Sequence, residues 1–445
     1  EKNAPALSRE TFEETIAPGL THLTMHRGRV DNRLVYRVLA GTYRKQRDAD
    51  ARIRALQQAA ISGTPIYSAG SYDIVVGRFS DRRRAVEMQE RISQLEPSQG
   101  LRIQEIRQDI SSPTGPWSIH VLIADPELMS VRVAHAYDTA IGVETTANLA
   151  ARQGALAAIN GGYYLESGLT RGDSQGVLMI EGRLLSEPDR GRAAVGFYSA
   201  QGRTRSLFGR LGLRSRIFLS GQDPIEVDGL NRARQENEII VYTPEFHRTS
   251  LTSPGGAEVV VVDAKITEIR QARGSSNIPP AGYLISMGSR ASDAHLAMFK
   301  VGAEVRLDLS LIPLGTESDQ DWSKAEWIVG GGPLLLWRGR RIETPERESI
   351  SQTFFLARHP RTAVGVRPNG TLLLVTVDGR QPRKSVGMTL RELTDLFLEL
   401  GAESAMNLDG GGSTSMVIDG NTINSPSDLS GDRMNADALL VFARK

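Results

Sequence analysis

The chain has 445 residues, which is long enough for two domains with separate hydrophobic cores. Its 53 lysines and arginines nearly balance its 52 aspartates and glutamates, so overall charge argues against a nucleic-acid binder that relies on phosphate attraction. The lack of cysteine excludes disulfides, thiolate nucleophiles and Cys-ligated metal sites. No apolar run reaches the roughly 18–20 residues of a membrane span. A first residue other than methionine, Glu1, is compatible with a removed export signal.

An internal repeat marks the N-terminal part of the chain. Residues 36–43 (YRVLAGTY) are echoed by residues 72–79 (YDIVVGRF), and each copy alternates apolar and polar side chains as a half-buried strand does. An amphipathic helix pattern follows each copy, and then a short strand, at residues 65–67 and 101–106. The order β-α-β-β-α-β predicts a small ferredoxin-like sheet with both helices on one face.

Residues 36–107 resemble the SPOR domain, a bacterial module that binds peptidoglycan glycan strands stripped of stem peptides. The likeness covers both halves of the repeat, and the block has thirteen basic residues against eight acidic ones. The resemblance implies a glycan groove on the exposed sheet face, where aromatic rings bury the CH groups of a sugar. The aromatic candidates are Tyr36, Tyr43, Tyr72 and Phe79. Strand parity predicts opposite faces for Tyr36 and Tyr43, and a generic ferredoxin-like module with solvated charges is the alternative interpretation.

The segments on either side of this block are predicted to form one interrupted domain. Residues 17–29 have a strand pattern whose natural hairpin partner is residues 117–124, and the polar linker 109–115 suits an insertion boundary. Loop tips tolerate insertions. We therefore expect a discontinuous larger domain, residues 1–32 and 111–445, that carries the small module, residues 33–110, in a surface loop.

The remainder of the chain is rich in short β patterns and turns. Two helices are expected, at residues 146–153 and 389–400; the second has Thr389 as N-cap and Glu392 three residues later. The predicted fold class is α+β, with a large, mostly antiparallel β-rich domain. Its expected strands are residues 129–136, 176–180, 193–198, 238–242, 257–263, 304–309, 371–377 and 439–442.

Four glycine-bearing motifs stand out in this larger domain. They are residues 158–164 (AINGGYY), 327–334 (WIVGGGPL), 361–365 (RTAVG) and 406–415 (MNLDGGGSTS). A strand that runs directly into consecutive glycines brings bare N–H groups close to a ligand, and such a turn suits a phosphate or a developing oxyanion. Each motif alone is equally compatible with an ordinary structural turn.

Taken in this order, the motifs resemble the phosphodiester glycosidase family over nearly all of residues 146–445. The resemblance implies hydrolysis of a sugar-1-phosphodiester, with N-acetylglucosamine as the expected sugar and no redox or nucleotide cofactor. The residues that fall on the family's motif positions are Asn160, Arg361, Asp409, Gly411, Gly412, Ser413 and Thr414. Asp173 follows the first motif and is a looser match.

Substrate binding is assigned by hypothesis to three places. Arg361 is the candidate for bidentate contact with phosphate oxygens, together with the turn from Gly410 to Thr414. Asn160 would bind sugar hydroxyls or an acetamido group, and His359, close to Arg361, is a further pocket residue. The alternative role for Arg361 is pairing with a buried carboxylate.

Hydrolysis at an anomeric carbon usually needs a carboxylate on the far face of the sugar. Asp409 is the first candidate for nucleophile or base, and Asp173 or Glu326 is the candidate acid. Phosphate is already a good leaving group, so the acid can be dispensable. In the alternative interpretation Asp409 caps its own turn, and Asp173 and Glu326 are structural or solvated.

The sequence predicts no cofactor. The seven histidines lack HxH and HExxH spacing, and no serine lies in a GxSxG elbow. Asp378 and Asp428 lie on loops where a structural calcium ion could bind, but no EF-hand-like spacing supports it.

The combination predicts a glycosidase of the bacterial envelope, periplasmic or secreted, that the small module holds at the wall. A carbohydrate is the expected substrate and peptidoglycan the expected partner. Two alternatives remain. The larger domain can cleave ordinary glycosidic bonds of denuded peptidoglycan strands, or the chain can be a non-catalytic wall-binding or cell-division protein.

Overall fold

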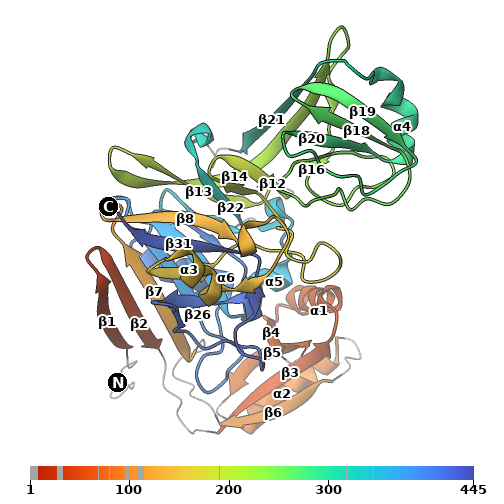
Figure 1. Cartoon of the computed structure of the whole chain (residues 1–445). Coiled ribbons are helices and arrows are strands. Elements are labelled where there is room, and N and C mark those ends of the chain that lie inside the picture. Colours follow the sequence, from red (N-terminus) through yellow and green to blue (C-terminus); the bar gives the residue numbers. More distant parts are fainter. Residues whose placement is uncertain are drawn as a thin grey trace. The chain divides into compact units, whose positions relative to one another are not determined.

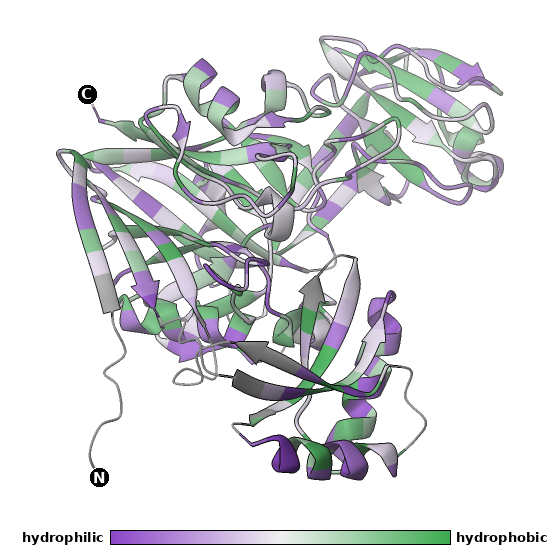
Figure 2. Cartoon of the chain, turned by 90° about the horizontal axis from the view of Figure 1, so that it is seen from below, coloured by the Kyte–Doolittle hydropathy of each residue, from purple (hydrophilic) through white to green (hydrophobic). Residues whose placement is uncertain are grey.

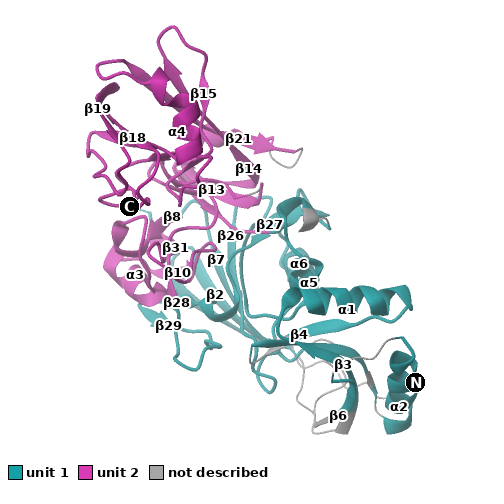
Figure 3. Ribbon diagram, turned by 90° about the vertical axis from the view of Figure 1, so that its right-hand side faces the viewer, with its two compact units in different colours: residues 1–130, 333–433, 443–445 teal, residues 131–332, 434–442 magenta. Residues whose placement is uncertain are grey.

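A computed structural model describes residues 9–27, 34–68, 70–79, 81–95, 100–107, 115–189, 191–315, 319–343 and 345–444. The chain forms two compact units, teal and magenta in Figure 3. Unit 1 takes in residues 1–130, 333–433 and 443–445, and unit 2 takes in residues 131–332 and 434–442. Both predicted boundaries of the small module lie outside the described residues. The expected linker at residues 109–115 also lies outside them, except for Gly115.

Unit 1 is built on an eight-stranded sheet in the order β1-β2-β7-β26-β25-β27-β23-β24. All neighbouring strands run antiparallel. The predicted pairing of the segment before the small module with residues 117–124 is present as β2 against β7, and β1 adds a strand that the sequence pattern does not predict. The strands are β1 (Arg9–Ala17), β2 (Leu20–Arg27), β7 (Trp117–Ala124), β26 (Leu372–Val377), β25 (Arg361–Val366), β27 (Ser404–Asn407), β23 (Leu334–Trp337) and β24 (Arg340–Arg341).

Helix α6 (Leu390–Glu399) packs against this sheet. Thr389 Oγ1 accepts a hydrogen bond from the Glu392 N–H, and the Glu392 carboxylate accepts one from the Thr389 N–H, which is the predicted capping box. Leu393 and Phe397 of the helix join apolar residues of β7 and β26 in one core cluster. Burying side chains of this size contributes about 1.5–3 kcal/mol each, so the helix is firmly held.

The repeat forms a four-stranded antiparallel sheet in the order β4-β5-β3-β6. Apolar residues of both helices and of the strands share one core cluster. Figure 2 shows hydrophilic and hydrophobic residues alternating along these helices, as expected for elements with one buried face. The β-α-β-β-α-β order is the predicted one, whereas a SPOR identity stays a prediction. The elements are β3 (Leu34–Tyr43), α1 (Gln46–Gln58), β4 (Thr64–Ser68), β5 (Ser71–Phe79), α2 (Arg82–Ser93) and β6 (Arg102–Arg107).

The two halves of this module share one local structural feature, a glycine covered by an aromatic ring. Gly41 and Gly77 both have positive φ, and a Cβ on either would come within 2.5–2.6 Å of the aromatic ring two residues later, Tyr43 or Phe79. Each ring therefore folds over its glycine. Because the ladder shifts register between Leu39 and Thr42, Tyr43 packs against the same core cluster as Tyr36. The predicted placement of these two tyrosines on opposite faces is wrong for this reason.

The module also contacts helix α5 (Gln352–Leu356) within unit 1, and Figure 3 shows α1 and α5 side by side. Ile66 of β4 forms an isolated parallel bridge with Arg358, and the Gln46 amide donates to Ser351 Oγ. The segment that contacts the module thus leads directly into His359 and Pro360, which precede β25 of the large sheet.

Unit 2 contains two larger sheets (Figure 1). One has the order β12-β11-β22-β13-β14-β15, with β21 also paired to β14, and the other has the order β16-β17-β20-β18-β19. All pairs in these two sheets are antiparallel except β16–β17. The β-rich, mostly antiparallel architecture predicted from the sequence is confirmed.

The strands of these two sheets have the following bounds: β11 (Leu178–Ile180), β12 (Arg183–Ser186), β13 (Ala193–Ala200), β14 (Arg203–Leu219), β15 (Ile225–Glu226), β16 (Gly229–Leu230), β17 (Ile239–Tyr242), β18 (Ala257–Val262), β19 (Lys265–Gln271), β20 (Gly282–Met287), β21 (Val305–Leu314) and β22 (Trp327–Gly330). The long β14–β21 ribbon extends from one sheet toward the core cluster of the other, which includes Ile217 and Val305.

The remaining elements of unit 2 surround a central strand, β31, which lies between β10 and β8. They are β8 (Met129–His135), β9 (Glu144–Thr145), α3 (Thr146–Gln153), β10 (Ala157–Asn160), β30 (Met434–Asn435) and β31 (Asp437–Ala443). Helix α4 (Ser289–His295) instead contacts β20. A short hairpin, β28 (Met416–Ile418) and β29 (Asn421–Thr422), belongs to unit 1. Within the described residues, no helix is long and apolar enough to cross a membrane.

Candidate functional site

The glycine loop, defined here as residues 409–414, follows β27 in unit 1. Asp409 Oδ1 accepts a hydrogen bond of 2.9 Å from the Gly410 N–H, which is the turn-capping contact considered as its alternative role. The Gly411 N–H donates to the Pro360 carbonyl at 2.9 Å, and Gly411 has φ +64°. A Cβ on Gly410 would lie 2.6 Å from the same carbonyl oxygen, so this position requires glycine. Asp409 remains half-buried.

Two arginines that the sequence analysis did not select lie against this loop. A Cβ on Gly411 would meet Arg380 Nη2 at 2.8 Å, and one on Gly412 would meet Arg433 Nη2 at 2.2 Å. Asp428 accepts from Arg433 Nε at 2.8 Å and lies 3.9 Å from Arg380 Nη1. Two guanidinium groups thus lie beside the glycines and share one carboxylate, Asp428. Guanidinium groups bind anions such as phosphate through several N–H donors.

Arg380 is held in an uncommon conformation. It follows β26 in the sequence Asp378-Gly379-Arg380, and its φ of +61° is in the left-handed region, which costs about 1–3 kcal/mol for a residue other than glycine. Arg380 Nη1 also donates to Ser427 Oγ at 3.4 Å, and Ser427 Oγ donates to the Gly411 carbonyl at 3.4 Å. The strained residue is therefore tied to the glycine loop by a second route. Backbone strain of this kind is concentrated at functional sites.

Arg361, the predicted phosphate ligand, is 1% exposed, and its guanidinium donates to backbone carbonyl groups. Its Nε donates to the Met388 carbonyl at 2.9 Å, and its Nη2 donates to the Ala357 and Phe354 carbonyls at 2.8 and 3.2 Å. Its guanidinium also lies 4.7 Å from the Phe354 ring centroid. These contacts favour a positioning role, in which Arg361 fixes the segment that holds the glycine loop.

His359 is buried beside Arg361. Its ring stacks on Phe354 with centroids 5.9 Å apart. Burial lowers the pKa of His359 well below its ordinary value, and Arg361 and Arg380 lower it further. The imidazole is therefore neutral at physiological pH.

Ser413 and Thr414 are buried at the end of the loop. The Thr414 carbonyl accepts from Asn424 Nδ2 at 3.1 Å, and Asp378 Oδ1 accepts from the Ser425 N–H at 2.8 Å. Asp378 Oδ2 lies 3.4 Å from Lys384 Nζ, while Asp428 pairs with Arg433. Both loop carboxylates considered for calcium thus have basic partners, and no group of three or more potential metal ligands occurs among the described residues.

In unit 2, the Asn-Gly-Gly motif surrounds a buried carboxylate, Asp437. Asn160 is 1% exposed at the end of β10. Asp437 Oδ1 accepts from the Gly162 N–H at 2.7 Å, and a Cβ on Gly161 would lie 2.0 Å from the same oxygen. Burial raises the pKa of Asp437, and His135 and its hydrogen bonds oppose the rise. The two glycines are required because the carboxylate lies against the backbone.

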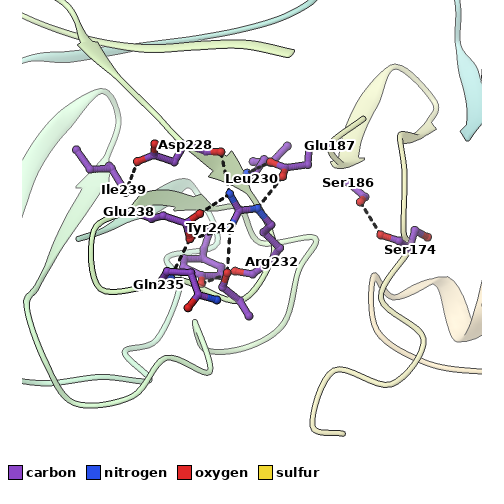
Figure 4. Close-up of polar contacts among 11 residues, drawn as sticks. Ser174, Ser186, Glu187, Asp228, Leu230, Arg232, Gln235, Glu238, Ile239 and Tyr242 are labelled. Atoms are coloured by element: carbon purple, nitrogen blue, oxygen red, sulfur yellow. Dashed lines mark hydrogen bonds and ion pairs between the residues drawn. The ribbon is translucent and has the colours of Figure 1, made fainter. Parts of the chain in front are cut away.

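Asp173 is the most strongly perturbed of the predicted acids. It is 4% exposed, and burial raises its pKa to about 7, with a further rise from Glu187 and an opposing effect from Arg232. Figure 4 shows Arg232 between two carboxylates: its Nε donates to Glu187 at 2.7 Å and its Nη1 donates to Glu238 at 2.8 Å. The Ser174 hydroxyl, next to Asp173, donates to Asp437 Oδ2 at 3.1 Å. A carboxyl group with this pKa can release a proton near neutral pH.

Glu326 has no comparable environment. It is half-buried before β22, where its backbone N–H donates to the Phe197 carbonyl at 2.9 Å. No described contact engages its carboxylate in a charge network. Asp173 is therefore the stronger candidate for the acid in unit 2.

The four aromatic candidates of the small module form two cross-strand pairs, Tyr36 with Phe79 and Tyr43 with Tyr72. All four are partly buried and pack against the module core. None is a fully exposed platform, so any glycan contact would use ring edges.

The residues that sequence reasoning missed are Arg380, Arg433 and Asp437. A weak signal was present for Arg380, because Asp-Gly-Arg directly follows a predicted strand. Arg433 and Asp437 carry no such pattern, and only the fold brings them to their glycines.

Residues 256–442 match the family model for phosphodiester glycosidases. This part of the chain is similar to phosphodiester glycosidases. Glu326, Arg361 and the glycine loop lie within the matched residues, whereas Asn160 and Asp173 precede them.

Known proteins match this chain in part. The SPbeta prophage-derived uncharacterized protein YomE of Bacillus subtilis (strain 168) is 48% identical over 71 residues, 16% of this chain and 11% of that protein. N-acetylglucosamine-1-phosphodiester alpha-N-acetylglucosaminidase of Bos taurus is 30% identical over 165 residues, 34% of this chain and 31% of that protein. The chain thus spans less than a third of the length of these two relatives.

A solved structure shares the fold over the full length. It is a protein of Burkholderia pseudomallei K96243 whose name suggests export, with a TM-score of 0.72 and 24% sequence identity. The match covers 98% of this chain and 97% of that one.

Proposed function

We propose that the protein hydrolyses a sugar-1-phosphodiester, with N-acetylglucosamine as the sugar released. The observation that carries this proposal is the pair of guanidinium groups of Arg380 and Arg433 against the glycine loop, within the matched domain. Bidentate guanidinium–phosphate contacts are among the stronger hydrogen-bonded pairs, because the fork of donors matches the phosphate oxygens. The phosphodiester is thus recognised chiefly by Arg380 and Arg433, and Arg361 holds the loop in place.

The catalytic roles follow from the carboxylates. Asp409 is the proposed nucleophile or base, because it is half-buried at the edge of the arginine-flanked loop. Asp173 is the proposed acid, because its raised pKa keeps a proton available near pH 7. Asn160 is proposed to bind the sugar. The leaving phosphate needs little protonation, so Asp173 contributes less than Asp409.

The test is turnover of an N-acetylglucosamine-1-phosphodiester, followed by mass spectrometry of the released sugar. Arg380→Gln and Arg433→Gln are expected to lower kcat/KM about 10- to 100-fold each, because each removes a charged hydrogen bond worth about 1.5–3 kcal/mol. Arg391→Gln, an exposed arginine paired only with Glu343, serves as the matched control and should retain activity. Full activity in both loop variants, or no turnover in the native protein, would contradict the proposal.

The small module supplies a proposal for location. Its β-α-β-β-α-β order and basic composition are those of a SPOR domain, so we propose that it binds denuded peptidoglycan strands in the bacterial envelope. Co-sedimentation of the full chain with denuded strands and with peptide-bearing sacculi tests this. Preferential binding to denuded strands is expected, and equal or absent binding would contradict it.

The same module favours one second function, cleavage of ordinary glycosidic bonds in those strands. Sugar release from purified denuded strands, but not from the phosphodiester, would establish this alternative. In that case the Arg380→Gln variant should retain activity on the strands, because no phosphate is present to bind.

A further inference from the structure

Unit 2 contains a cavity of about 690 Å³ to which the glycine motifs contribute Trp327 but no glycine. Its walls come from β8, the β11–β12 hairpin, residues 244–248, and the last residues of β31. On β31 the cavity is lined by Leu440 and Phe442, whereas the Asp437 carboxylate is bonded to Gly162 and Ser174. The volume falls within the roughly 300–1,000 Å³ typical of small-molecule sites.

Two of the three arginines that line the cavity have no acidic partner among the described residues. Arg132 and Arg248 both line it, and no ion pair among the described residues involves either one. By contrast, the acidic lining residue Asp138 is neutralised by Arg152 and accepts a further hydrogen bond from Gln153 at 2.7 Å. Unpaired guanidinium groups in a concave site favour an anionic ligand.

Arg183 lies between the two remaining acidic lining residues. Its guanidinium nitrogens are 3.7 Å from Glu245 and 3.8 Å from Glu181. Arg183 thus compensates these carboxylates in part, and Arg132 and Arg248 are the lining guanidinium groups that no ion pair of the described residues engages.

The wall beside Arg132 is aromatic. The Arg132 guanidinium carbon lies 4.9 Å from the Phe442 ring centroid and 5.9 Å from that of Trp327. Both rings line the cavity and are half-buried. Flat, half-buried aromatic surfaces of this kind are those on which sugar rings pack their CH groups. The positive group of Arg132 therefore lies over the aromatic wall.

The rim of the cavity is a fixed turn. Tyr137 and Asp138 have φ of 54° and 56°, two consecutive left-handed residues that are not glycine. Glu144 accepts from the Tyr137 N–H at 2.9 Å, and Arg152 Nη2 donates to Glu144 at 2.7 Å. This network holds the strained turn in place and leaves Tyr137 60% exposed.

We propose that this cavity binds an anionic saccharide, with its carboxylate or phosphate on Arg132 and Arg248 and its ring on the Trp327–Phe442 wall. The features of the cavity alone argue for an anionic ligand. The identification of that ligand as a saccharide rests on the proposed function. The site would select substrates or wall fragments that carry a negative group beyond the bond that is cleaved.

Titration calorimetry tests the proposal with three sugars: N-acetylmuramic acid, N-acetylglucosamine 6-phosphate and neutral N-acetylglucosamine. The full chain is used in the Arg380→Gln/Arg433→Gln background, so that the glycine loop adds no second phosphate site. Adding Arg132→Gln and Arg248→Gln is expected to weaken binding of at least one anionic sugar by tenfold or more. The matched control, Arg290→Gln, should change nothing, because that side chain is 77% exposed and remote from the cavity lining.

The two anionic sugars distinguish the source of the negative charge. Binding of the first alone indicates a carboxylate ligand, and binding of the second alone indicates a phosphate ligand. The proposal is overturned if neither binds, or if the cavity variants bind as the control does. The Arg380→Gln/Arg433→Gln background lacks the loop arginines, so any anionic-sugar binding measured in it is independent of the glycine loop. The cavity proposal can therefore hold even if the native chain does not hydrolyse the phosphodiester, and the two proposals can fail separately.

Discussion

The Gly411 N–H donates a hydrogen bond of 2.9 Å to the carbonyl oxygen of Pro360, and this contact joins the glycine loop to the start of β25. The next residue, Arg361, holds the carbonyls of Ala357 and Met388 with its guanidinium. The buried guanidinium of Arg361 therefore fixes the backbone segment to which the glycine loop is hydrogen-bonded. Loop geometry and local stability depend on the same side chain.

Replacing Arg361 with lysine is expected to destabilise the protein by about 2–4 kcal/mol, because a single ammonium cannot reach carbonyls on three residues and leaves buried acceptors unsatisfied. Activity should fall through kcat, since the loop loses its support. Urea unfolding and steady-state kinetics measure both effects. If Arg361 instead binds phosphate directly, Arg361→Lys would raise KM while the free energy of unfolding stays unchanged.

Two alanine substitutions in the glycine loop are expected to behave differently. At Gly410 the new Cβ would lie 2.6 Å from a backbone carbonyl, which cannot move freely, so Gly410→Ala should cost about 1–3 kcal/mol of stability. At Gly412 the nearest atoms belong to the tips of Arg433 and Asp428, which can shift. Gly412→Ala should therefore leave the melting temperature nearly unchanged and reduce kcat/KM. Equal melting temperatures for the two variants would contradict this account.

The sequence predicts the elements of the fold better than it predicts the site. Helix α6 and its capping box are local, because the N-cap and its partner are three residues apart. The two strands of the repeat are also predicted from local sequence, because apolar and polar side chains alternate along each of them. Even there, the face of Tyr43 was mispredicted, because a register shift next to Gly41 is decided by the partner strand.

Long-range contacts explain what the sequence could not predict. Arg361 is in a motif, yet its guanidinium bonds to carbonyls on a helix and on the segment before α6, which no spacing rule connects. Arg433 reaches the glycine loop from a segment without a motif. Asp437 meets Gly162 only because β31 pairs with β10. In each case the motif residue was found and its partner was not.

Asp173→Asn is expected to change both the pH profile and the stability. Because the folded-state pKa, about 7, lies above the unfolded value near 3.9, the carboxyl contributes stability below pH 4 that is lost as pH rises toward 7. The variant should therefore gain stability relative to the native protein across this range, by about 2–4 kcal/mol. If Asp173 is the acid, native kcat/KM falls above pH 7 and the variant's profile is flat there. Parallel pH profiles for native protein and variant would remove Asp173 from the mechanism.

A buried histidine pair in unit 1 should make the protein sensitive to acid. The His22 and His120 rings stack with centroids 5.5 Å apart, and His120 Nδ1 lies 3.3 Å from His22 Nε2. Burial lowers the pKa of both histidines. The pKa of His120 falls to about 3, and the neighbouring His22 contributes to that fall. Folded-state pKa values below the unfolded value of about 6.5 mean that the neutral pair is favoured, so stability is present above pH 6.5 and is lost as pH falls toward 3.

The expected loss is about 1.4 kcal/mol per pH unit for each histidine that must stay neutral. Urea unfolding of the native protein, His120→Gln and the control His26→Gln at pH 7, 6, 5 and 4 measures it. His26 is exposed, so its variant should follow the native slope, whereas His120→Gln should lose stability less steeply on acidification. If the stability of His120→Gln falls with the same slope as that of the control, the histidine pair does not account for the acid sensitivity.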